Sequence, residues 1–230
     1  MTTVAPPPIA DTAPGRPAIL DDAAVFGQPR GLLLVSVVEM WERFSFYGMR
    51  ALLVLYLVNA IGWSDGDASR LYGTYAGLVW LTPLIGGYLA DRLLGTRRSL
   101  VIGALVIALG HFLLALQSMT MFYAGLACVI VGTGFFKPNV STMVGQIYRE
   151  GDPRRDAGFT IYYMGINTGA FLAPLVCGWL GQRVGWHYGF GAAGVGMLVG
   201  LAVYLWGRDT DLPGVGLPPD RTAAARRAPG

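Results

Sequence analysis

The chain has 230 residues, of which 53% are hydrophobic and 13% are charged, about half the charged share of an average soluble domain. Its mean hydropathy is +0.49, and its net charge of +3 is too small and too scattered for a nucleic-acid-binding protein. This composition excludes most soluble folds and also a disordered chain, because disordered segments are poor in apolar residues. It favours a polytopic helical membrane protein, in which the 33 glycines let helix backbones approach closely.

Six apolar stretches, each near the ~20 residues that a helix needs to cross a bilayer, lie between two polar, proline-rich ends. The predicted membrane helices cover about 31–61, 71–94, 99–116, 121–148, 157–182 and 184–207. We therefore expect an all-α membrane protein with six transmembrane helices. The expected organisation is a disordered N-terminal tail, a six-helix bundle and a linker or tail, at residues 1–30, 31–207 and 208–230.

Basic residues are concentrated on one side of this topology. An even number of spans places both ends of the chain on the same side, together with the loops after the second and fourth spans. These segments carry 12 of the 17 Lys and Arg residues, whereas the loops on the other side carry only Arg70 and Arg183. The excess predicts that both ends are cytoplasmic.

The first span contains charged residues at helical spacing. Glu39, Glu42 and Arg43 follow one another at i, i+3 and i+4, and Tyr47 and Arg50 extend the same face. A charge near the bilayer centre costs ~2.5–3.5 kcal/mol, so this face must line a protein interior or a water-filled cavity. A structural ion pair would explain one acid and one base, but not two acids and two arginines. The stripe therefore indicates a functional site.

Polar residues of three spans lie at a similar predicted depth. Arg43, Lys137 and Asn167 are 11 or 12 residues from the cytoplasmic ends of the first, fourth and fifth helices, or ~16–18 Å, near the midplane. The fourth span is interrupted by two glycines and Pro138, as in helices that form transporter binding sites. The first and fourth helices would be the equivalent first members of two inverted three-helix repeats.

Enzymatic chemistry is the least favoured function. The sequence shows no pairing of a nucleophile with a base, no metal-ligand cluster and no cofactor-binding loop. Cys128 and Cys177 lie singly in apolar runs and are expected to be packed helix residues. We expect neither a metal nor an organic cofactor.

Four segments together resemble a known family. EMWERFSFYGMR (39–50) resembles the ExxER signature of proton-dependent oligopeptide transporters, which belong to the major facilitator superfamily. GYLADRLLGTRR (87–98) is similar to the superfamily's loop motif between helices two and three. GTGFFKPNVS (132–141) and FTIYYMGINTG (159–169) resemble the family's fourth- and fifth-helix patterns. Their order matches the family, and the resemblance covers about residues 31–207.

The resemblance implies roles for two groups of charged residues. Glu39 and Glu42 would take part in proton coupling, with Arg43 pairing with them and responding to their protonation. Asp91 and Arg92 would belong to a conformational latch at the cytoplasmic face. The coupling ion would be the proton, with no further cofactor.

The resemblance also implies a peptide-binding pocket. A positive pocket for the peptide carboxylate would be formed by Arg43, Tyr47, Arg50 and Lys137. Asn167 would hydrogen-bond the peptide backbone or amino end. Two departures make the pocket wall less polar, since Phe46 replaces the first residue of a double tyrosine and Trp80 stands where a tyrosine is common.

The resemblance further implies that the chain is the N-terminal six-helix bundle of a two-bundle transporter. The whole protein would be a symporter that imports di- and tripeptides with protons across the plasma (inner) membrane by alternating access. Its partners would be small peptides, protons, the lipid bilayer and a C-terminal six-helix bundle, with no nucleic acid.

Two alternatives remain open at this point. A related proton-coupled carrier of nitrate or another small anion would also suit a positive pocket. A non-transporting, truncated membrane protein would keep the helices without the activity.

Overall fold

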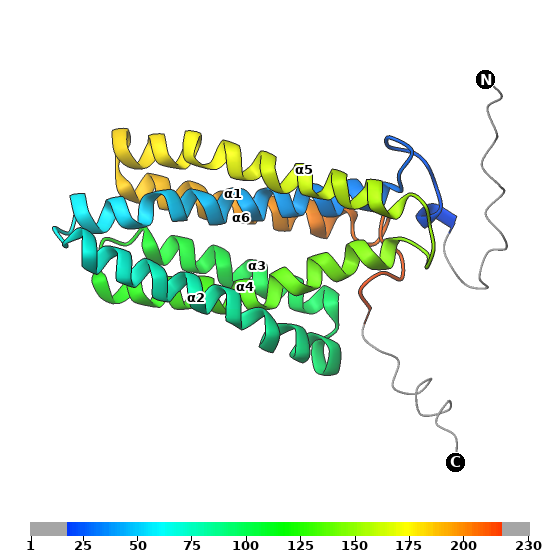
Figure 1. The fold of residues 1–230 in the computed structure, drawn as a ribbon, viewed down its shortest axis with the longest axis horizontal. Helices are drawn as coiled ribbons and strands as arrows, with labels where there is room; N and C mark the ends of the chain where they lie inside the picture. Colours follow the sequence, from blue (N-terminus) through cyan, green and yellow to red (C-terminus); the bar gives the residue numbers. More distant parts are fainter. Residues whose placement is uncertain (1–17, 218–230) are drawn as a thin grey trace, which may run out of the picture.

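The computed structural model describes residues 18–217, and in this range six long helices lie side by side in one bundle (Figure 1). They are α1 (Arg30–Asn59), α2 (Asp65–Leu89), α3 (Thr96–Leu114), α4 (Met119–Ile147), α5 (Arg155–Ala173) and α6 (Trp186–Gly207). Shorter helices are η1 (Ala18–Leu20), η2 (Ala90–Leu94), η3 (Pro174–Gly178) and η4 (Leu180–Val184). Because η2 extends α2, and η3 and η4 extend α5, the bounds follow the predicted spans closely.

The all-helical membrane fold is confirmed, whereas the number of membrane crossings is confirmed only in part. Among the described residues, four helices are long and apolar enough to cross a membrane: α3, α4, α5 with its extension to Val184, and α6. The other two are 30 and 25 residues long, but they carry charged side chains, four of them in the interior of α1. Six crossings therefore remain a prediction.

Glycines allow α3 and α4 to pack backbone against backbone. A β-carbon on Gly103 would lie 2.7 Å from the carbonyl oxygen of Gly132, and one on Gly110 would lie 2.7 Å from that of Gly125. In both helices the two glycines are seven residues apart, or two helical turns. Small residues at an interface between membrane helices let their backbones approach closely.

The helix pairing follows a pattern that two three-helix repeats would produce. The main contacts join α1 with α5 and α6, α4 with α2 and α3, and α3 with α6. Exchanging α1 with α4, α2 with α5 and α3 with α6 leaves this set of pairs unchanged. The pattern supports the predicted repeats, in which α1 and α4 hold equivalent central positions.

The segment before α1 packs against the bundle instead of forming the disordered tail expected up to residue 30. Leu20 is buried, and Asp21 forms an ion pair of 2.5 Å with Arg149 in the loop between α4 and α5. Tyr148 donates a hydrogen bond of 2.8 Å to Gln28. These contacts order residues 18–29, while residues 1–17 of the expected tail lie outside the described range.

The segment after α6 is also packed, although a linker or tail is expected there. Arg97 at the start of α3 donates hydrogen bonds to the carbonyl oxygens of Val215 at 2.7 Å and Arg208 at 3.0 Å. It also pairs with Asp209 at 2.9 Å, and Leu212 is fully buried. One arginine thus fixes residues 208–217 over the end of the bundle, and residues 218–230 lie outside the described range.

Replacing Gly132 by valine should destabilise the bundle. The new β-carbon would lie 2.7 Å from Ile107 Cγ1 and 2.8 Å from the Gly103 carbonyl oxygen, and overpacking of this kind costs about 1–3 kcal/mol. Thermal unfolding of the purified chain in detergent measures the loss. Gly77→Val is the matched control, because nothing lies within 4 Å of a β-carbon there. Equal losses in both variants would assign the effect to valine's helix propensity instead of to helix contact.

Candidate functional site

The charged residues of α1 form one buried cluster. Glu39, Glu42 and Arg43 expose 2%, 0% and 6% of their surfaces. Arg43 Nε lies 3.1 Å from Glu39 Oε1, and the same guanidinium forms an ion pair with Glu42. The predicted spacing therefore does bring all three side chains together. One guanidinium serves two carboxylates, so the cluster has a formal charge of −1.

Two tyrosines from neighbouring helices complete this cluster, and neither is among the site residues expected from the sequence. Tyr162 of α5 interacts with the Glu39 carboxylate. Tyr75 of α2 interacts with Glu42 and Arg43, and its buried hydroxyl has no hydrogen-bond partner among residues 18–217. Tyr162 lies inside the fifth-helix motif, which is the signal that could have identified it.

Lys137 of α4 lies near the cluster and rests on an aromatic ring. Its ammonium interacts electrostatically with Arg43 and both glutamates. The Nζ atom is 3.3 Å from the centroid of the Trp80 ring of α2, a cation–π contact. Within the described part of the chain, no carboxylate lies at ion-pair distance from this ammonium. The structure thus brings Arg43, Lys137 and Trp80 to one region, as the sequence predicts.

Arg50 and Tyr47 lie further along α1, towards α2. Arg50 is exposed, and its guanidinium carbon lies 5.7 Å from the ring centroid of Tyr47 and 5.5 Å from that of Tyr72. Arg50 is seven residues beyond Arg43, or ~10 Å along the helix. It therefore adds a second positive charge at some distance from the buried cluster.

Asn167 is exposed on α5, and the described residues make no hydrogen bond with its side chain that links it to the cluster. Its position along the bundle axis is nevertheless close to that of the Glu39–Glu42–Arg43 cluster. Gly165 and Gly169, on either side of it, pack against the backbones of Ser36 and Met40 in α1. The structure thus supports the predicted depth of Asn167 but shows no contact with Arg43 or Lys137.

Asp91 and Arg92 lie at the end of the bundle, away from the charged cluster. Both are exposed in η2, where the Arg92 guanidinium carbon stands 4.9 Å from the ring centroid of Tyr88. Asp91 lines a cavity of about 320 Å³ together with Thr96 and Leu217. Their predicted latch role stays a prediction.

The described residues contain no group of three or more metal-ligating side chains. A site of this kind can hold a proton on a carboxylate and attract an anionic group to an unpaired cation.

Comparison with known proteins identifies the family. The model of the POT family, PTR2, matches residues 97–210. A di-/tripeptide transporter of Lactococcus lactis subsp. cremoris is 44% identical over 209 residues, which cover 87% of this chain and 42% of that protein. The uncharacterized transporter YclF of Bacillus subtilis (strain 168) is 49% identical over 193 residues, which cover 81% of this chain and 39% of that protein.

Solved structures agree with these matches. A crystal structure of the peptide transporter POT in complex with sulfate has a TM-score of 0.82 and 43% identity, covering 88% of this chain and 43% of that chain. A POT family transporter in complex with a thioalcohol conjugated peptide has a TM-score of 0.82 and 36% identity, covering 90% and 45%. The chain spans less than half the length of these relatives. Its sequence motifs, its fold and these matches show that it belongs to the POT family.

Proposed function

We propose that the chain is the N-terminal half of a proton-coupled transporter that imports di- and tripeptides by alternating access. The observation that carries this proposal is a buried pair of glutamates sharing one arginine beside a lysine without a carboxylate partner among residues 18–217. Relatives named as di-/tripeptide transporters, and one bound to a peptide conjugate, support the substrate class. A C-terminal six-helix bundle would supply the other half of the cavity.

The glutamates are suited to exchanging a proton. Arg43 pairs with Glu39 and Glu42 at once, while Glu42 Oε1 is buried without a hydrogen-bond partner in the described structure. A buried carboxylate is costly unless it is paired or protonated. Adding a proton to one glutamate would make the cluster neutral. It would also release the Arg43 guanidinium from that carboxylate, so that the side chain could change position. Proton uptake would thus be linked to a rearrangement of Arg43.

The cations around the cluster suit a peptide's terminal carboxylate. The site contains three cations, Arg43, Arg50 and Lys137, and two carboxylates, Glu39 and Glu42. Its formal charge is therefore +1, which a peptide carboxylate would neutralise. Lys137 can leave the Trp80 ring for a stronger, charge-assisted partner. Trp80 offers an indole N–H in place of a tyrosine hydroxyl, so this wall of the pocket accepts fewer hydrogen bonds.

Other parts of the proposal concern orientation and gating. Both ends of the chain would face the cytoplasm across the plasma (inner) membrane, as the distribution of basic residues predicts. Asp91 and Arg92 would form a latch there, and Asn167 would hydrogen-bond the peptide backbone or amino end. The proton would be the only coupling ion, with no cofactor and no enzymatic step.

Glu42→Gln should uncouple transport from the proton gradient. Glutamine keeps the shape of the side chain but cannot exchange a proton, so uphill accumulation should be lost while exchange of peptide across the membrane continues. The variant is made in the longer protein that contains both halves and is measured in proteoliposomes. Glu150→Gln removes an exposed carboxylate in the α4–α5 loop and should behave as the native protein. Continued accumulation by Glu42→Gln would exclude Glu42 as the coupling residue.

Lys137→Ala should weaken the binding of peptides with a free carboxylate. A charged hydrogen bond contributes about 1.5–3 kcal/mol, so the affinity should fall about 10- to 100-fold. Peptides amidated at the C-terminus should lose little, and Lys137→Arg should keep most of the binding because it keeps the charge. Binding is measured by competition in the longer protein. A similar loss for amidated peptides would make Lys137 a structural residue, and tighter binding of nitrate than of peptide would favour the anion carrier.

The chain alone should fold as helices but should not drive peptide uptake. Alternating access needs two bodies that move about a shared site, and the chain supplies one of them. The measurement is uptake of a labelled dipeptide into liposomes under an inward proton gradient. Co-expression with a C-terminal half should restore uptake. Robust uptake by residues 1–230 alone would instead indicate a functional homodimer.

A further inference from the structure

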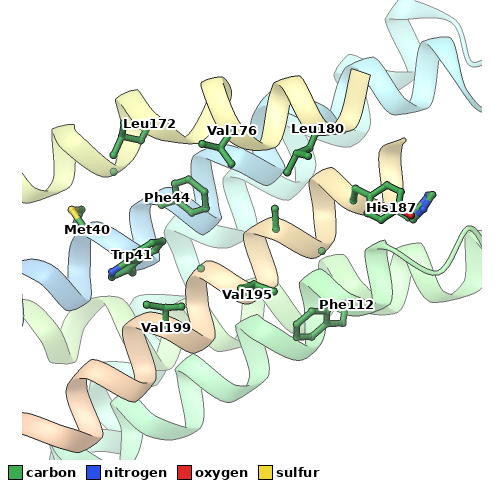
Figure 2. Close-up of a pocket in the computed structure, with 15 residues that line it drawn as sticks. Met40, Trp41, Phe44, Phe112, Leu172, Val176, Leu180, His187, Val195 and Val199 are labelled. Atoms are coloured by element: carbon green, nitrogen blue, oxygen red, sulfur yellow. The ribbon is translucent and has the colours of Figure 1, made fainter. Parts of the chain in front are cut away.

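A groove lies on one side of the bundle, and its lining contains none of the charged residues of the candidate site. It has a volume of about 690 Å³ and lies between α5 and α6, with α1 as its floor. Figure 2 shows α5 and α6 close together near His187 and further apart towards Val199, with Trp41 and Phe44 between them. The two helices both pack on α1 and meet each other mainly where the chain turns into α6. A tapering gap thus opens to the side of the bundle.

Most of the residues that line this groove are apolar. From α5 and its extension come Leu172, Val176 and Leu180, at i, i+4 and i+8. From α6 come Gly191, Val195 and Val199, again at i, i+4 and i+8. Each set forms one stripe along its helix, and both stripes point into the groove. Since Gly191 has no side chain, the wall recedes there.

Apart from the indole N–H of Trp41 on the floor, the polar side chains that line the groove are at its narrow end. His187 lies there beside Tyr188, and its Nδ1 is 3.2 Å from Gln117 Nε2. Arg183 is exposed four residues earlier in the chain, before the glycine turn that leads into α6. These groups mark where the groove reaches the membrane–water interface, since aromatic and basic side chains gather at that level.

The dimensions match one leaflet of a bilayer. His187 and Val199 are 12 residues apart on α6, so the groove is ~18 Å long. The hydrocarbon core of a bilayer is ~30 Å thick, and one leaflet therefore contributes ~15 Å. A groove that starts at the interface and ends near the midplane has the length of a single acyl chain.

We propose that this groove seats one acyl chain of a membrane phospholipid, whose headgroup lies beside His187, Tyr188 and Arg183. Hydrocarbon fits because the groove is apolar and opens sideways at membrane depth, where no water is present to fill it. The ligand belongs to the leaflet on the side of the turn between η4 and α6. The seated chain would contact Trp41 on the groove floor.

Trp41 provides a native reporter for this site. The chain is reconstituted into bilayers of phosphatidylcholine brominated at the middle of its acyl chains, because bromine quenches indole emission on contact. The contribution of Trp41 is obtained by subtracting the indole emission of Trp41→Phe from that of the native chain. We expect brominated lipid to remove more than half of this emission.

Filling the groove separates a seated lipid from general contact with the bilayer. Val195→Phe places a ring between the two stripes, at a residue that is 55% exposed. Leu198→Phe makes a comparable change at an exposed residue of α6 outside the groove. The first variant should lose most of the Trp41 quenching, and the second should keep it. Circular dichroism checks that both variants keep their helical content.

Native mass spectrometry after extensive washing in detergent provides a second measurement. The native chain and Leu198→Phe should each retain one phospholipid, and Val195→Phe should retain none. A native chain without lipid, or equal retention by Val195→Phe, would overturn the proposal. So would a dimer in which Trp41 is shielded from brominated lipid, because a second copy of the chain would then occupy the groove.

Discussion

The bundle is organised around a guanidinium that serves two carboxylates within a membrane. Removing the guanidinium would leave two carboxylates buried without a partner, and breaking a buried ion pair in this way costs about 3–5 kcal/mol in proteins. The cluster must therefore be enclosed, and α1 is enclosed: α5 and α6 pack along it, while Tyr75 of α2 and Tyr162 of α5 approach its charged face. The central place of α1 follows from the charges that it carries.

Close packing of the other helices makes this enclosure possible. α4 brings Lys137 to the cluster only because α2 and α3 pack tightly against it, through glycines whose backbones nearly touch. Gly86 of α2 contacts the Gly134 backbone, and this contact lies close to the Trp80–Lys137 pair in the sequence of both helices. The glycine content that first suggested a membrane protein is therefore also what positions the site.

Much of this could be predicted from the sequence, because helix length, apolar runs and i, i+4 spacing are local properties. The bounds of the helices and the Glu39–Glu42–Arg43 cluster belong to this class. Contacts between helices do not, so Tyr75 and Tyr162 were missed, and Asn167 was expected nearer to the cluster than its contacts show. The packing of residues 18–29 and 208–217 was missed for the same reason, since polar, proline-rich segments show no periodicity. They are ordered by partners far away in the chain, such as Arg149 and Arg97.

The bundle has two open sides, and their chemistry differs. On one side Trp80 is 68% exposed while its ring holds the Lys137 ammonium. A cation at that position is stable beside water or a polar partner but costly beside hydrocarbon, so this side faces a cavity or another helical body. On the other side, the groove between α5 and α6 presents apolar residues at every turn. Contact with hydrocarbon is favourable for such a surface, and contact with water is not. Under the two proposals above, the bundle would be oriented about its own axis with the α2–α4 face towards a partner body and the α5–α6 face towards lipid.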